Sequence, residues 1–273
     1  MRINVAGRSY RDGLEIDAAQ FSELLKVHSR PEDVSTSHPA PADFVKVFNH
    51  FPEQDVVAIL PSSALSGSYG AALQAQASMG RAGQRIQVLD SGSISIGLGL
   101  LVLAATESLL SNPDLTGQEL SSRLSALRPK LHIIFTVSSL KYLAKSGRVN
   151  RVGSPISAVL KAYHTFCFDG QKAIAPVARD FELTDALERI TNKIKTDHEL
   201  YTITNLHLAC SYNFRQNSVT GTSGHIQAEP STFIEQFSQR FATFDLPILH
   251  TELGCVVGVH CGPSTVGAAY ITA

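Results

Sequence analysis

This sequence of 273 residues has few cysteines, almost no net charge and no long hydrophobic run. Each of these shortages excludes some classes of protein function. The four cysteines are widely spaced and form no C-x-x-C pair, which argues against a zinc site built on cysteines. The 23 Lys and Arg nearly balance the 24 Asp and Glu, so the chain lacks the basic footprint of a general nucleic-acid binder. We expect a cytoplasmic protein with free thiols that binds no nucleic acid.

The most apolar stretch, ISIGLGLLVLAA at 94–105, is too short to span a bilayer. It runs directly into polar residues, so we expect a helix that is buried on most sides and no stable membrane insertion. The start of the chain, MRINVAGRSYRDG, lacks the apolar core of a secretory signal, in agreement with a cytoplasmic location.

Familiar catalytic motifs are also missing. The sequence contains no G-x-x-x-x-G-K-[ST] phosphate loop and no G-x-S-x-G nucleophile elbow. Its ten histidines show no H-x-x-x-H spacing, so we expect neither a metal site nor a metal cofactor.

Strand and helix patterns alternate in the first half of the chain. The apolar runs DVVAILP at 55–61 and RIQVLDS at 85–91 predict buried strands, followed by helices over 68–80 and 95–110. This alternation predicts a parallel α/β sheet, preceded by an extended segment over 1–12 and helices over 16–27 and 41–51. Ligands bind at the carboxyl ends of such strands, where the polar stretches SSALSGS and DSGSIS occur.

The pattern changes near LHIIFTV at 131–137. The second half predicts a hairpin over 163–178 that turns at Asp169-Gly170. After it we expect a helix over 183–196, a strand over 206–212, a helix over 231–242, and two strands joined around CGPS in the tail. The predicted fold class is α/β with two domains. Residues 1–130 form a parallel α/β domain, and residues 131–273 form an α+β domain with a mixed or antiparallel sheet.

Two clusters of hydroxyl side chains suggest a binding site. Thr36 and Ser37 precede one predicted helix, and Ser62, Ser63, Ser66 and Ser68 surround the start of the next. Each cluster could be no more than a helix cap. Together, two helix N-termini with spare hydroxyls could converge to form an anion site.

Two further residues are candidates for a functional role. His260 is flanked by glycines in GVHCGPS, and a histidine on a predicted strand could serve a structural role or a functional one. Arg148 follows Gly147, the predicted end of a short helix capped by Ser138. Its guanidinium could be a solvated surface charge, or it could bind a carboxylate or phosphate.

Six segments together resemble the DegV family of fatty-acid-binding proteins: SYRDGLEID, TSHPAPADF, LPSSALSGSYGAA, VLDSGSISIGLGLLVLAA, TVSSLKYLAKSGRVNR and VVGVHCGPSTVGAAYI. The resemblance covers nearly the whole chain and is loose only over about 180–250. It implies two α/β domains with a long-chain fatty acid in a buried tunnel between them. It further implies a binding subunit with no catalytic machinery and no cofactor. Such a subunit presents the carboxylate to a separate fatty acid kinase subunit and carries the acyl phosphate to an acyltransferase of phospholipid synthesis.

The resemblance also assigns roles to residues of this chain. Thr36 and Ser66 match the carboxylate donors, and Ser37 and Ser63 are second candidates. Arg148 and His260 match residues that complete the polar network. The family motif T-S-Q-P-S reads Thr36-Ser37-His38-Pro39-Ala40 here, so His38 replaces an amide. The family also has a strand and an Asp-Ser loop before SYRDG, so we expect the first domain to lack that strand.

Two other readings remain open at this point. One is a lipid hydrolase or phosphotransferase that uses His260 with a nearby serine, which ATP hydrolysis by the isolated protein would favour. The other is a degenerate or regulatory relative that keeps the fold but has impaired lipid binding, which exposed apolar surface would support.

Overall fold

The centre of the protein is a six-stranded mixed sheet with the order β10-β9-β11-β6-β7-β8. The computed structural model describes residues 1–28, 30–148, 162–168, 174–210 and 230–273. The strands of this sheet are β6 (Leu131–Val137), β7 (Tyr163–Phe168), β8 (Ala175–Asp180), β9 (Ile203–Cys210), β10 (Ile248–Glu252) and β11 (Thr265–Thr272). The β9–β10 pair is parallel and the other pairs are antiparallel, which confirms the predicted mixed sheet.

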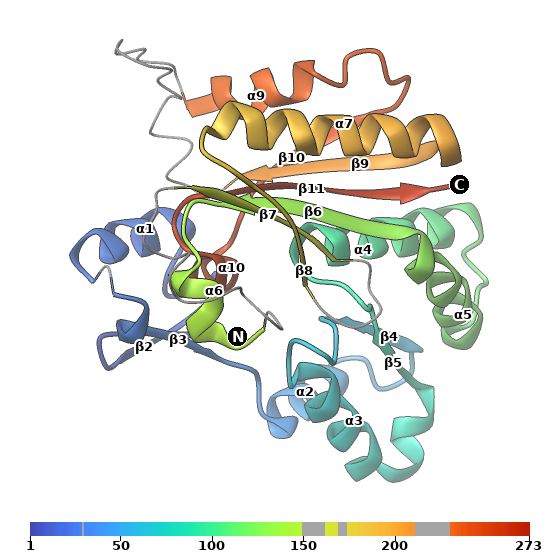
Figure 1. Cartoon of the computed structure of the whole chain (residues 1–273). Helices are drawn as coiled ribbons and strands as arrows, with labels where there is room; N and C mark the ends of the chain where they lie inside the picture. The colour runs from blue at the N-terminus through green and yellow to red at the C-terminus, as the bar shows by residue number, and fades with distance from the viewer. Residues whose placement is uncertain (29, 149–161, 169–173, 211–229) are drawn as a thin grey trace.

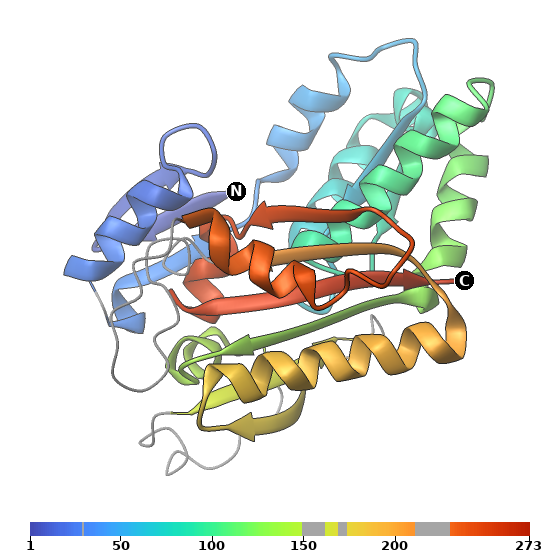
Figure 2. The ribbon, with the colours of Figure 1, turned by 90° about the horizontal axis from the view of Figure 1, so that it is seen from above.

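Strand β11 lies inside this sheet, and all eight of its residues are buried. Helices α7 (Leu183–Tyr201) and α9 (Pro230–Gln239) cover one face, and α4 (Ser95–Ser111) lies against the other (Figure 1). Figure 2 shows that α7 and α9 lie over the sheet when the molecule is seen from above. The continuous apolar sequence of β11 fits a strand that is covered on both faces.

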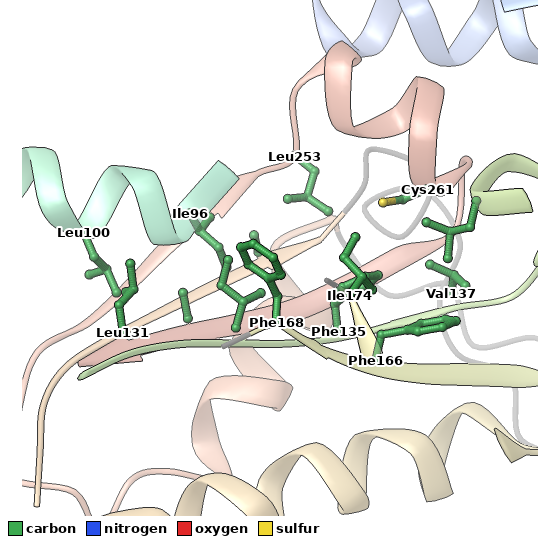
Figure 3. Close-up of a cluster of buried hydrophobic side chains, with 14 of the residues drawn as sticks. Ile96, Leu100, Leu131, Phe135, Val137, Phe166, Phe168, Ile174, Leu253 and Cys261 are labelled. Atoms are coloured by element: carbon green, nitrogen blue, oxygen red, sulfur yellow. The ribbon is translucent and has the colours of Figure 1, made fainter. Parts of the chain in front are cut away.

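The core between the sheet and α4 is rich in aromatic side chains. Phe135, Phe166 and Phe168 point from the sheet toward α4 and α10 (Cys255–Cys261), while α7 lies beyond the opposite face (Figure 3). Helix α4 contributes Ile96 and Leu100 to this core. Helix α4 precedes residue 130, the predicted boundary between the two domains. Residues on both sides of this boundary therefore share one core. The boundary itself stays a prediction.

Helix α4 also differs in part from expectation. It was predicted to be buried on most sides, yet Val102 and Leu103 on its outer side are 45% and 39% exposed. Helix α5 (Gly117–Leu127) packs beside it and places Leu120 and Leu124 against Leu89 of the first half.

The first half contains two small sheets rather than one larger parallel sheet. β4 (Val56–Leu60) and β5 (Ile86–Asp90) pair in parallel, as predicted, with α2 (Pro41–Phe48) and α3 (Ser68–Ser78) beside them. The separate antiparallel sheet has the order β2-β1-β3. The other described elements of the first half are β1 (Arg2–Val5), β2 (Arg8–Arg11), β3 (Val34–Ser37), α1 (Ala18–Val27) and the 3-10 helices η1 (Pro31–Asp33), η2 (Gly80–Arg85) and η3 (Arg128–Lys130).

The tail shows the largest departure from the predicted elements. Residues Cys255–Cys261 form α10, so the prediction of a strand before CGPS was wrong. In the sequence CVVGVHC, apolar residues recur with a spacing that suits either a strand or a helix. The structure selects the helix, because Cys255 and Val259, four residues apart, pack together against Phe21 of α1 in one cluster.

Two turn predictions have different outcomes. Gly147 ends α6 (Lys141–Ser146) with a φ of 66°, as expected of a closing glycine, but the helix follows Leu140 and Ser138 does not cap it. The predicted turn at Asp169-Gly170 lies outside the described residues, although β7 and β8 on either side of it pair antiparallel.

We expect Gly267→Ala to destabilise the fold and Gly99→Ala to do the opposite. A Cβ on Gly267 would lie 2.6 Å from Cβ of Phe135 and 2.8 Å from the backbone oxygen of Ile134, whereas one on Gly99 in α4 meets nothing within 4 Å. Overpacking at Gly267 should cost about 1–3 kcal/mol of unfolding free energy. Helix propensity should contribute up to about 1 kcal/mol at position 99. Urea unfolding measures both, and equal stability of the two variants would contradict the packing argument.

Candidate functional site

A cavity of about 160 Å³ lies where α10, α6 and the loops after β3 and β4 meet. Its wall is mostly apolar with a few polar side chains, and the lining residues are Met1, Thr36, His38, Pro61, Leu65, Ser66, Gly67, Ile94, Ser95, Leu143, Arg148, Ile174, Val256, Val257, His260 and Cys261. The cavity therefore lies at the carboxyl end of β4, as the strand pattern predicted. Its wall draws on residues from both halves of the chain.

The serine-rich loops after β4 and β5 are tied to each other. The Ser62 amide donates to the Ser93 carbonyl at 2.7 Å, and the Ser91 amide donates to the Leu60 carbonyl at 3.0 Å. The Ser91 hydroxyl donates to the same Ser93 carbonyl at 3.0 Å. These buried serines thus hold the two loops in place, which leaves Ser66 and Ser95 of the same stretches at the cavity.

A hydrogen bond joins Thr36 to His260 across 224 residues of sequence. The Thr36 hydroxyl on β3 lies 2.8 Å from Nε2 of His260 on α10. Burial, together with the positive charges of Arg148 and Lys145, lowers the pKa of His260 to about 4. The imidazole is therefore neutral at pH 7. Its Nδ1 is buried and has no partner among the described residues.

Ser66 stands at the start of α3. Its hydroxyl donates to the Ser68 hydroxyl at 3.0 Å and accepts from the Ser68 amide at 3.3 Å. The N-terminus of a helix carries partial positive charge, which favours an anion beside it. The hydroxyl of Ser66 is thus fixed next to a region of positive potential.

Arg148 connects two backbone segments at the cavity wall. Nη1 donates to the Ser146 carbonyl at 2.7 Å, and Nε makes a longer contact of 3.5 Å with the Leu65 carbonyl. These bonds join the end of α6 to the loop after β4 and leave a cation at the wall of the cavity.

Four of the six predicted site residues thus meet at one cavity: Thr36, Ser66, Arg148 and His260. The second candidates, Ser37 and Ser63, do not line it. Both residues are exposed, and the Ser63 hydroxyl donates to the Asp90 carboxylate at 2.6 Å. A role for these two serines in ligand binding stays a prediction.

Sequence reasoning missed several wall residues. Val256 and Val257 were assigned to a strand and Cys261 to the connection after it, so their place on a helix facing the cavity was not foreseen. For Ser95, the only sequence feature that pointed to a binding site was the polar stretch DSGSIS that contains it. Ser95 begins α4 with a φ of 49°, a conformation that residues other than glycine adopt rarely and that is common near functional sites.

A second cavity of about 30 Å³ adjoins the first. The two share Ile94, Ser95, Val257 and Cys261. The second continues toward the sheet, where Ile133 and Phe135 of β6 form its wall, in the core shown in Figure 3. The pair of cavities is polar at one end and apolar at the other, a shape that suits an elongated amphipathic molecule with an acidic head.

Metal and membrane features are absent from the part of the chain that the structure describes. There, no group of three or more His, Cys, Asp and Glu side chains is arranged to hold a metal ion. None of the described helices is long and apolar enough to cross a membrane.

The fold and site define an α/β protein with a mostly apolar cavity at the carboxyl end of β4, beside the helix α10. The family model described as "Uncharacterised protein, DegV family" matches residues 1–273, and the chain belongs to the DegV family.

Individual relatives extend over most of the chain. A DegV domain-containing protein of Caldanaerobacter subterraneus subsp. tengcongensis is 25% identical over 276 aligned positions, which cover 99% of this chain and 89% of that protein. A Thermus thermophilus DegV family protein, described for its fatty acid binding, superposes with a TM-score of 0.79 at 24% identity and covers 100% and 90% of the two chains. The fatty acid kinase (Fak) B3 protein of Streptococcus pneumoniae, loaded with linoleic acid, gives 0.79 at 17% identity and covers 100% and 89%.

We expect His260 to make the protein lose stability as the pH falls from about 6.5 toward 4. An unfolded histidine takes up a proton near pH 6.5, whereas the pKa of folded His260 is about 4, so protons favour the unfolded chain in this window. At pH 4.5 the loss should be on the order of 2 kcal/mol. It should shrink in His260→Gln and persist in His50→Gln, which removes an exposed histidine outside the cavity. Urea unfolding at pH 7.5 and 4.5 measures this, and an equal loss in both variants would contradict the assignment.

Proposed function

We propose that this protein binds a long-chain fatty acid, with the acyl tail in the two adjoining cavities and the carboxylate at the polar side chains of the first. The observation that carries the proposal is that Thr36, Ser66, Arg148 and His260 line one cavity whose wall is otherwise mostly apolar. Structures of the same fold from Thermus thermophilus and Streptococcus pneumoniae are described with fatty acid binding, which supports this choice of ligand.

The tail should supply most of the affinity. Burial contributes about 0.8 kcal/mol per methylene, so a tail of about fifteen carbons gives on the order of 10 kcal/mol before the costs of association. The carboxylate must exchange its water for hydrogen bonds inside the protein. Each bond to a charged group contributes roughly 1.5–3 kcal/mol, so a few donors are enough to set the orientation.

The bond between Thr36 and His260 prepares the hydroxyl for an anion. A threonine hydroxyl has one hydrogen, which it can give either to the imidazole or to a ligand. When Nε2 of the neutral His260 carries the ring hydrogen, it donates to Thr36, and the hydroxyl hydrogen stays available for the carboxylate. Nδ1 is then the acceptor that has no partner among the described residues. His260 thus acts as a positioning residue for Thr36.

We further propose that the protein is a carrier rather than an enzyme. It would present the carboxylate to a separate fatty acid kinase subunit in the cytoplasm, which phosphorylates it with ATP, and then pass the acyl phosphate to an acyltransferase. The likeness to the Fak B3 protein supports a kinase partner. His260 bonds to Thr36 rather than to a serine, which speaks against a serine hydrolase built on this histidine. His38 and Gly67 are exposed cavity residues, so the polar end lies within reach of a partner.

Mass spectrometry of the purified protein, native and then denatured, tests the binding proposal directly. A fatty acid that is released only on denaturation would support it and name the preferred chain. An empty protein that also fails to take up palmitate or oleate would favour a degenerate or regulatory role for this DegV fold. Acyl phosphate formed only after a fatty acid kinase subunit and ATP are added would support the carrier role, whereas ATP hydrolysis by the protein alone would favour an enzyme.

We expect Thr36→Ala combined with Ser66→Ala to weaken binding of palmitate at least about tenfold, because the carboxylate loses two hydroxyl donors and 1.4 kcal/mol equals a factor of ten. The control Ser122→Ala/Ser125→Ala removes two hydroxyls of α5 that bond only to carbonyls of their own helix, and it should bind normally. Fluorescence displacement measures the affinities, with circular dichroism to verify folding. Equal affinity of the two double variants would remove Thr36 and Ser66 from the site.

A further inference from the structure

His38 is a second imidazole at the cavity, and its surroundings differ from those of His260. It lines the cavity but is exposed, whereas His260 is largely withdrawn from solvent. Its Nδ1 lies 3.0 Å from the carbonyl oxygen of Pro39. A carbonyl can only accept a hydrogen bond, so Nδ1 carries the ring hydrogen and Nε2 of the neutral ring carries a lone pair.

The Nε2 edge of the His38 ring is held against the start of α3. A Cβ placed on Gly67 would lie 2.5 Å from Nε2 and 2.6 Å from Cδ2 of this ring. Gly67 and the adjacent Ser66 both line the cavity. Only the missing side chain of Gly67 allows the ring to lie this close to the start of α3.

A carboxylate and a neutral His38 do not suit each other. Both would present lone pairs, and two acceptors cannot form a hydrogen bond. A protonated ring carries a second N–H at Nε2 and can donate a charge-assisted hydrogen bond to the carboxylate. The negative charge of a carboxylate beside the ring favours this protonated form.

The other ionisable side chains of the cavity wall do not change charge near pH 7. They are Arg148, His260 and Cys261. Burial keeps His260 neutral and raises the pKa of Cys261 to about 12. Arg148 is a fixed cation. Asp43 is an acidic side chain on α2, the helix that follows His38. Its carboxylate accepts a hydrogen bond from the Ala40 amide at 3.1 Å.

We propose that His38 is an additional head-group ligand that takes up one proton from solvent when the carboxylate binds. This inference rests on the fatty acid binding proposed above. The proton goes to Nε2 of His38, and the resulting imidazolium donates to the bound carboxylate. Binding therefore tightens as the pH falls from 8 toward 6, by up to about tenfold per pH unit for one linked proton.

Proton uptake is measured by titration calorimetry with dodecanoate, below its micelle concentration, at pH 7 in phosphate and in Tris. The two buffers differ in ionisation enthalpy, so the difference in heat reports protons taken up per bound ligand. Protonation of the fatty acid itself is common to all variants and cancels when variants are compared. We expect wild type to take up about half a proton or more beyond the value for His38→Gln.

Two further variants make the comparison specific. Gly67→Ala keeps the imidazole but pushes its Nε2 edge out of the site, and the exposed ring can swing into solvent without disturbing the core. It should lose the extra proton uptake just as His38→Gln does. His50→Gln is the matched control, because His50 is also exposed and also bonds a backbone carbonyl through Nδ1, at 2.7 Å from Lys46, but does not line the cavity. It should keep the wild-type uptake.

The outcomes separate this inference from the proposed function. Equal proton uptake by wild type and His38→Gln, with both binding dodecanoate, overturns the role of His38 and leaves fatty acid binding standing. If Gly67→Ala takes up as many protons per bound ligand as the wild type, the placement of Nε2 of His38 beside the bound carboxylate is overturned. Failure of the wild type to bind dodecanoate, or palmitate offered in its place, overturns fatty acid binding and this inference together.

Discussion

Strand β11 and its neighbours in the six-stranded sheet carry apolar side chains on both faces. The structure therefore depends on burying the face that lies opposite α7 and α9. On that face, α4 and α10 cover the strands without closing completely against each other. The remaining space is the pair of cavities, whose shared residues Ile94, Ser95, Val257 and Cys261 lie at the start of α4 and on α10. An incompletely filled core normally costs stability. Here the gap ends at polar groups, which fits a space that a ligand fills.

The same constraint explains why the site is assembled from distant parts of the sequence. Strand β11, which follows α10 at the end of the chain, pairs with both β6 and β9 inside the sheet. Helix α10 is thereby placed between the sheet and the small β2-β1-β3 sheet, and it packs on Val34 and Phe21 through Val259. That packing brings His260 within 2.8 Å of Thr36. The polar end of the cavity therefore exists only when the tail of the chain has found its place.

The sequence predicted much of this fold because its signals are local. Continuous apolar runs identified β4 and β5, and Gly147 marked the end of α6. Local patterns marked Thr36, Ser66, Arg148 and His260 as candidates, and the resemblance to the DegV family assigned all four to one site. The second candidates Ser37 and Ser63 had the same chemistry, but side chains leave β3 and the serine loop in different directions, and only the structure shows that Ser63 turns to Asp90.

The errors have a physical cause as well. CVVGVHC is short and apolar, so its periodicity cannot decide between strand and helix, and tertiary packing decides instead. The parallel sheet of the first half is small because β1 and β3 pair with each other, an antiparallel contact between segments that are thirty-one residues apart at Asn4 and Ser35. Short polar strands of this kind carry little hydrophobic signal, and their pairing follows from packing against α1 and α10.

The two imidazoles of the cavity show how position, rather than residue type, assigns chemistry. His260 lies among Cys261, Val259 and the cations Arg148 and Lys145, and burial keeps it neutral, so it can hold a hydroxyl in one orientation over the whole neutral range. His38 lies at the exposed end, where water can deliver a proton to its ring. In the role proposed for His38, the site would combine the neutral dipole of His260 with a charge that appears when the carboxylate binds. An apolar cavity could then accept an anionic head without a second permanent cation in addition to Arg148.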